Sequence, residues 1–179
     1  MFKTNLKNLL NYKEIYKFYN LKIFEFLFYC ILSFTLPFLI KSPQWIIGII
    51  VNFFLIRSAI YFELKYVLPI VIFPSIGVFT AGIIFGVNTF YLLYFLPIIW
   101  IGNFLFILSY KFLRFKKNKN IWITPIYSSI IKSGIIFIFA SIMVLIFEFP
   151  IVFLKSMGYM QLITAVIGSY LATISYKII

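Results

Sequence analysis

The sequence predicts an all-α, polytopic membrane protein with six membrane-spanning helices. Of its 179 residues, 64% are hydrophobic and only 11% are charged, whereas soluble domains are about half apolar and about a quarter charged. The apolar residues form six continuous stretches of roughly 20 residues, the length that a helix needs to cross the hydrocarbon core. Continuous runs favour helices over a barrel, whose strands alternate apolar and polar residues.

We expect the spans at residues 21–40, 44–61, 66–84, 88–108, within 121–147, and at 158–178. The break between spans three and four, at residues 85–87, carries no charge, so it is either a tight hairpin or the middle of one interrupted unit. Pro74-Ser75 is expected to break span three near its middle. Residues 21–179 then form one transmembrane domain. The Lys-rich arm at residues 1–20 is predicted to be a cytoplasmic, basic amphipathic helix on the membrane surface.

The distribution of Lys and Arg predicts that both termini lie in the cytoplasm. Twelve of these residues lie in the N-terminal arm and the start of span one, in the links after spans two and four, and at the C-terminus, against only Lys41 and Lys155 on the opposite side. Positive residues concentrate on the cytoplasmic side of membrane proteins. The net charge of +12 then reflects contact with anionic lipid rather than nucleic-acid binding. We expect a multi-pass protein of the cell membrane.

The inventory of reactive side chains argues against an enzyme and against a metal site. The chain has no His and no Asp, and its only acids and thiol are Glu14, Glu25, Glu63, Glu148 and Cys30. A catalytic triad, a Cys-His pair and a Cys/His metal site therefore cannot be built. No phosphate-binding or dinucleotide-binding glycine motif is present. We expect no catalysis, no metal and no cofactor.

Polar residues inside the spans are the candidates for a function, since each is costly in hydrocarbon. Gln44, Gly48 and Asn52 recur at i, i+4 and i+8, so they share one face of span two. Two amides that flank a glycine can hydrogen-bond a ligand that approaches closely. The alternative is that the amides bond across helices and that Gly48 is a packing contact.

Span four contains a second polar group, in which Trp100 and Asn103 follow Pro97. A proline within a helix frees a backbone carbonyl and kinks the axis, which can open a cavity. Trp100 and Asn103 are therefore candidate ligand contacts. Interhelical hydrogen bonding is the alternative role for Asn103.

Apart from Lys22 and Lys177 at their ends, the expected spans contain three charged residues. Glu25 and Arg57 are each about one turn from the inner end of neighbouring antiparallel spans, so we predict a structural ion pair. Lys132 lies deeper, within span five. It either snorkels to the inner surface or contacts a partner subunit or an anionic group of a ligand.

The six-span topology, with both ends inside and no cytoplasmic domain, resembles that of the substrate-binding (S) components of energy-coupling factor (ECF) transporters. The resemblance rests on three motifs: Pro43-Gln44-Trp45 with Gly48 and Val51-Asn52, Pro74-Ser75 with Gly82, and Pro97 with Gly102-Asn103. It implies an S-component-like bundle that binds a vitamin, a cofactor precursor or a metal ion near its outer face. It also implies docking to a transmembrane coupling subunit that is powered by cytoplasmic ATPases. The absence of His argues against the metal-ion branch.

By this resemblance, the outer pocket uses Gln44, Trp45, Asn88, Trp100, Glu148, Lys155 and Gln161. Asn52 and Asn103 complete the expected ligand-binding set. The expected function is capture of a small molecule of the vitamin or cofactor-precursor class for uptake, with separate ATPase and coupling partners. The alternative is a non-transport integral membrane scaffold or assembly protein.

Overall fold

The described residues are helical throughout, apart from the short links between helices. A computed structural model describes residues 12–40 and 43–178. Within these residues, six helical segments are long and apolar enough to cross a membrane, which confirms the all-α prediction with six spans. The α-helices are α2 (Tyr12–Leu39), α3 (Gln44–Tyr61), α4 (Leu68–Ala81), α5 (Leu92–Lys111), α6 (Thr124–Ile146), α7 (Val152–Met157) and α8 (Tyr159–Ile178). Shorter helical turns at Leu64–Tyr66, Gly86–Tyr91 and Phe112–Lys116 join some of them.

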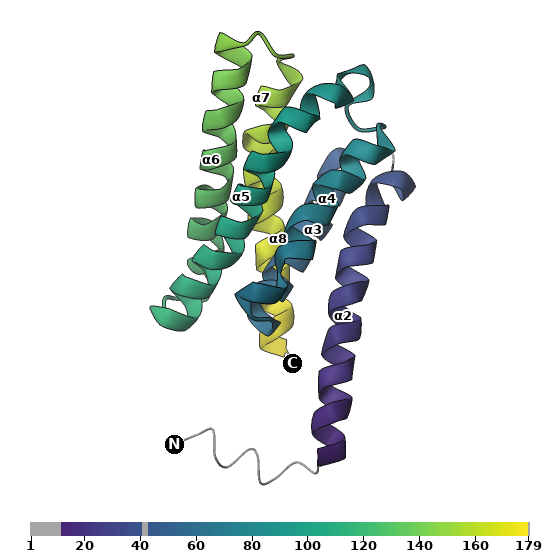
Figure 1. Ribbon diagram of the computed structural model, residues 1–179. Helices are drawn as coiled ribbons and strands as arrows, with labels where there is room; N and C mark the ends of the chain where they lie inside the picture. The colour runs from purple at the N-terminus through teal and green to yellow at the C-terminus, as the bar shows by residue number, and fades with distance from the viewer. Residues whose placement is uncertain (1–11, 41–42, 179) are drawn as a thin grey trace.

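The helices run back and forth along one axis, as Figure 1 shows. The start of α2 and the end of α8 lie at the same end of the bundle, at the bottom of that view. We call this the terminal end, and we call the other end, where α3 and α8 begin, the distal end. The predicted boundary at residue 20 falls inside α2, which is continuous from Tyr12. Residues 1–11 of the predicted arm lie outside the described residues.

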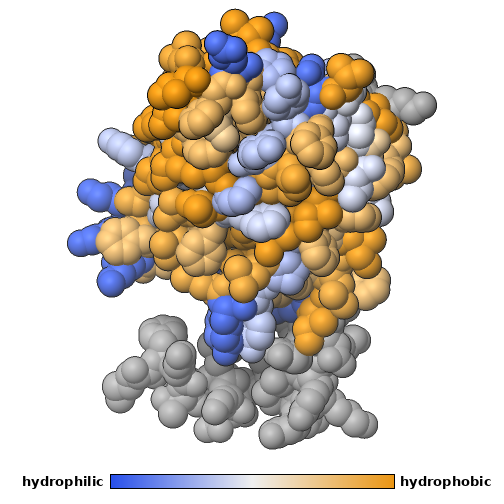
Figure 2. Space-filling view, turned by 45° about the horizontal axis from the view of Figure 1, so that its top comes forward, coloured by the Kyte–Doolittle hydropathy of each residue, from blue (hydrophilic) through white to orange (hydrophobic). Residues whose placement is uncertain are grey.

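The outer surface of the bundle is apolar. Large hydrophobic side chains such as Leu39, Leu145 and Val87 are 71%, 76% and 96% exposed. Figure 2 shows hydrophobic residues across most of one face, with the strongly hydrophilic residues at its margins. A soluble monomer rarely exposes a continuous apolar surface of this size. The surface is that of a multi-pass membrane protein, whose outward side chains contact lipid.

Helices α3 and α8 make the most extensive helix contact, because small residues of α8 let the two backbones approach. Ala165 and Ala172 are fully buried. A Cβ atom added to Gly168 would lie 2.6 Å from the carbonyl oxygen of Ile49 and 2.8 Å from Cβ of Asn52. Small residues at a helix contact are the usual basis of close packing in membranes. This contact fixes α8 against the face of α3 that carries the amides.

Helix α4 packs on α2 through a second close approach and does not break at Pro74-Ser75, so that prediction was wrong. The helix continues from Leu68 to Ala81 with Pro74 inside it. A proline removes a single N–H, and neighbouring helices make this tolerable in a spanning segment. A Cβ added to Gly77 would lie 2.3 Å from the carbonyl oxygen of Phe34, so the two helices pack backbone to backbone.

The link between α4 and α5 is a chain reversal rather than an interruption of one helix. Gly82 ends α4 with φ 66°, and Gly86 has φ 52°. These left-handed conformations are readily adopted only by residues without a Cβ. Thr89 stabilises the turn, since its hydroxyl donates to the carbonyl oxygens of Gly82 and Gly86 at 3.1 and 2.7 Å.

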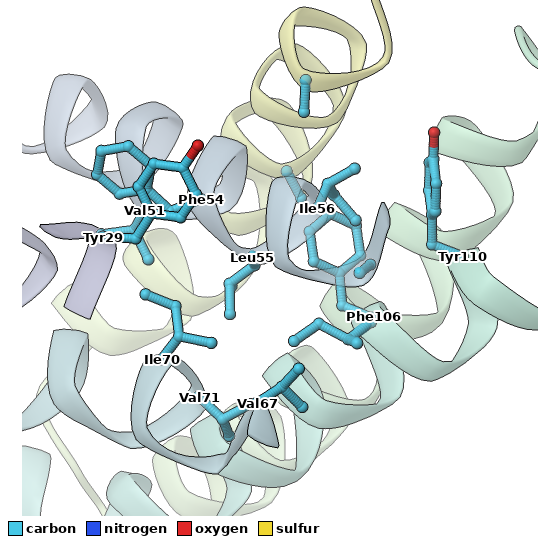
Figure 3. Close-up of a cluster of buried hydrophobic side chains, with 14 of the residues drawn as sticks. Tyr29, Val51, Phe54, Leu55, Ile56, Val67, Ile70, Val71, Phe106 and Tyr110 are labelled. Carbon is cyan, nitrogen blue, oxygen red and sulfur yellow. The ribbon is translucent and has the colours of Figure 1, made fainter. Parts of the chain in front are cut away.

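Two apolar clusters hold the bundle together. The larger one joins α2, α3, α4, α5 and α8, and Figure 3 shows its side chains meeting between these helices. The smaller one lies near the distal end and is built on stacked rings. The ring of Phe153 from α7 is 4.8 Å from that of Phe95 and 4.9 Å from that of Phe85. The polar cavity described next is bordered by both clusters.

Candidate functional site

A cavity of about 100 Å³ lies inside the bundle. Six helices contribute to its wall, and α2 is the one α-helix of the described residues that does not. Gln44 and Gln161, in the first turns of α3 and α8, line it at the distal end. Asn52 lies eight residues further along α3, which is about 12 Å deeper at 1.5 Å per residue. The polar lining residues are Gln44, Asn52, Ser75, Asn103, Lys132 and Gln161, set among apolar side chains.

A chain of hydrogen bonds across three helices forms the deep part of this cavity. The Lys132 ammonium of α6 donates to Oδ1 of Asn52 on α3 at 2.5 Å. Nδ2 of Asn52 donates in turn to Oγ1 of Thr164 on α8 at 3.2 Å. Lys132 Nζ also lies 5.1 Å from the ring centre of Phe106, within the range of a cation–π contact. The polar groups of α3, α6 and α8 are therefore held in one connected arrangement.

Lys132 points into the bundle and does not snorkel to the surface, so the snorkelling interpretation was wrong. Helix α6 begins at Thr124 with Pro125 in its first turn, which places Lys132 about 12 Å inside. Its side chain is directed at Asn52, and the residue is only 2% exposed. A buried ammonium needs a hydrogen-bond acceptor. The amide oxygen of Asn52 on the facing helix provides one, so the side chain does not have to extend to water at the surface.

Asn103 and Ser75 line the opposite wall and are held by neighbours. Nδ2 of Asn103 donates to the carbonyl oxygen of Val71 at 3.0 Å. Ser75 accepts a hydrogen bond from the indole N–H of Trp100 at 2.8 Å and donates to the carbonyl oxygen of Ile72 at 2.9 Å. Trp100 thus orients a lining residue and does not belong to the lining itself.

The face of α3 that carries Gln44, Gly48 and Asn52 serves both roles that the sequence left open. All three residues line the cavity. Gly48 also packs on α8, since a Cβ added there would lie 3.0 Å from Cβ of Thr164. Asn52 bonds to the same threonine. Cavity lining and helix packing therefore coincide on this face.

The predicted ligand-binding residues separate into three groups. Gln44, Asn52, Asn103 and Gln161 meet in the central cavity. Trp45 borders a small adjoining space of about 40 Å³ with Gln44 and Gln161. The remaining predicted residues, Asn88, Trp100, Glu148 and Lys155, do not line the central cavity.

Lys132 and the buried hydroxyl residues of α6 form a recognisable sequence pattern that the predicted ligand-binding set did not include. The buried polar residues of α6 are Thr124 and two adjacent pairs, Ser128-Ser129 and Lys132-Ser133, which follow one another at intervals of about four residues. Such spacing places them on one helix face. Polar residues that repeat at helical spacing in an apolar span indicate a helix face that contacts protein rather than lipid. This pattern could have predicted that Lys132 points into the bundle.

The charged pair Glu25 and Arg57 lies towards the terminal end, away from the cavity. Nη2 of Arg57 lies 2.8 Å from Oε1 of Glu25. The same guanidinium donates to the hydroxyls of Tyr29, Tyr61 and Ser175 at 3.2–3.3 Å. The hydroxyl of Tyr29 also donates to Glu25. This network joins α2, α3 and α8, which is a structural role.

Among residues 12–40 and 43–178, no three His, Cys, Asp or Glu side chains come together to hold a metal ion. Comparison of the chain with protein families, characterised proteins and solved structures finds no match. Functional inference therefore depends on the cavity itself.

Proposed function

We propose that this protein is a membrane-embedded capture subunit for the uptake of a small molecule, of the vitamin or cofactor-precursor class. One observation carries the proposal: a cavity of about 100 Å³, with a few polar residues in an apolar wall, reaches from the distal end to the middle of the bundle. Mostly apolar pockets with a few convergent polar groups are the usual form of small-molecule sites. Two amides, Asn52 and Asn103, and Lys132 are buried in a spanning bundle, which carries a cost that a bound ligand offsets.

The proposal includes an orientation and partners. The Lys and Arg bias predicts that the terminal end faces the cytoplasm, so the cavity loads from the outside at Gln44 and Gln161. The longest link between spans is short, and the described residues contain no nucleotide-binding domain. Energy for uptake then comes from separate ATPases through a transmembrane coupling subunit, as in the ECF transporters that the sequence resembles.

Identification of a co-purified ligand tests the proposal. The protein is purified in mild detergent, denatured, and its extract analysed by mass spectrometry for a stoichiometric small molecule. We expect a ligand in the parent protein that is lost in Asn52→Leu and Gln44→Leu. Asn88→Leu is the matched control, because it makes the same amide-to-leucine change outside the cavity lining, and it should retain the ligand.

The scaffold alternative makes the opposite prediction. It expects no small molecule in the extract and an unchanged set of bound proteins in all three variants. Co-purification of ATPase subunits together with a ligand would support capture. A retained protein partner without any ligand, from cells grown in rich medium, would contradict it.

A further inference from the structure

Lys132 is the one charged side chain that lines the central cavity. The ion pairs of the described residues are Arg57 with Glu25 and Lys65 with Glu63, so no described carboxylate balances Lys132. One of its three N–H groups is used by Asn52 at 2.5 Å. The ring of Phe106 faces the ammonium at 5.1 Å. An ammonium has three donors, so it can also donate into the cavity that it lines.

The surroundings of Lys132 stabilise a positive charge only in part. An amide oxygen and an aromatic ring supply partial negative charge, whereas taking an ammonium out of water costs several kcal/mol or more. Charged residues inside membranes usually face a partner or a water-filled space and mark a substrate path. A negatively charged group of the ligand, placed against Nζ, would supply the missing counter-charge.

Resting on the proposed function, we infer that the ligand is a small organic monoanion whose carboxylate binds Lys132, with the rest of the molecule directed towards Gln44 and Gln161. A single lysine balances a single negative charge, so a monocarboxylate fits better than a doubly charged phosphate. The amides of Asn52 and Asn103 lie beside this position and can donate or accept hydrogen bonds.

The size of the cavity limits the ligand further. Pockets for drug-sized ligands measure roughly 300–1,000 Å³, whereas this one measures about 100 Å³. The cavity therefore favours a compact molecule over a large cofactor. The apolar wall, which includes Ile99, Val78 and Phe85, suits a short aliphatic or single-ring body.

Matched carboxylate and amide probes test the charge requirement in the full-length protein. The thermal unfolding midpoint is measured in detergent with about 10 mM sodium propanoate or benzoate, and with propanamide or benzamide at equal sodium chloride. We expect at least one carboxylate to raise the midpoint by about 5 °C or more. The amide of the same acid should bind at least about tenfold more weakly than the carboxylate.

Two variants and the co-purified ligand complete the test. Lys132→Met removes the charge and keeps an unbranched side chain of similar length, and Lys132→Gln keeps a donor for Asn52. Both should abolish the carboxylate response, while Asn88→Leu should preserve it. The molecule extracted from the parent protein should be a monoanion that is depleted about tenfold or more in both Lys132 variants.

The outcomes separate this inference from the proposed function. A neutral or cationic ligand, an equal response to amide and carboxylate, or full ligand retention in both Lys132 variants would overturn the anion inference and leave ligand capture standing. Absence of any co-purified molecule, together with no response to any probe, would overturn both.

Discussion

Replacement of Gly168 by alanine tests the closest helix contact next to the cavity. The added Cβ would lie 2.6 Å from the carbonyl oxygen of Ile49, and ordinary contacts begin at 3.4 Å, so α8 must shift by about 0.8 Å or strain its backbone. Overpacking of this kind costs about 1–3 kcal/mol. The gain in helix propensity from glycine to alanine returns up to about 1 kcal/mol. We therefore expect Gly168→Ala to be less stable by about 1–3 kcal/mol than a glycine-to-alanine change without overlap.

Gly134→Ala in α6 is the matched control. A Cβ added to Gly134 meets no atom within 4 Å, so this variant gains helix propensity without overlap. Reversible unfolding in mixed micelles containing a denaturing detergent, followed by circular dichroism, gives the free energy of unfolding of each variant. The difference between the two variants isolates the packing cost. If Gly168→Ala were as stable as Gly134→Ala, the close approach of α3 and α8 would be refuted.

Three further substitutions probe polar contacts, with the free energy of unfolding measured in the same assay. Glu25→Gln should lower the free energy of unfolding by about 1–3 kcal/mol. This is less than the cost of breaking a fully buried ion pair, because the Glu25 side chain is 32% exposed. An unchanged free energy of unfolding would argue against the network around Arg57. Tyr110→Phe should cost about 1 kcal/mol, since its buried hydroxyl lies 2.8 Å from that of Thr173; no loss would mean that this bond does not contribute. Lys111→Met should cost about 1–2 kcal/mol and speed hydrogen exchange in the last turn of α3, because its ammonium bonds to the carbonyl oxygens of Ala59 and Phe62 at 2.6 and 2.7 Å. Unchanged exchange there would contradict this capping role.

The six spans could be predicted from sequence because length and hydropathy alone determine which segments can cross a bilayer. Local effects of single residues were harder to predict. Pro74 does not break α4, since the effect of a proline depends on whether neighbouring helices support the freed backbone group. The backbone contact of Gly77 with Phe34 joins segments far apart in the sequence, and no local pattern specifies that pairing.

The candidate site could be predicted on the helix where its residues recur at helical spacing. Gln44 and Asn52 share a face of α3, and both line the cavity. The sequence could not show that this face meets Lys132 of α6 and Thr164 of α8, because that meeting depends on helix packing. Asn88 and Glu148 are polar and near the same end of the bundle, yet neither lines the cavity, since polarity and depth alone do not determine the direction of a side chain.

An experimental density map of the protein purified from cells grown in rich medium tests the central claim most directly. We predict density for one compact molecule inside the bundle, in contact with Asn52, Asn103 and Lys132. The same map of Asn52→Leu should lack that density while the helices keep their positions. A cavity in the parent protein that is filled by its own side chains, or a bound molecule located elsewhere, would contradict the account.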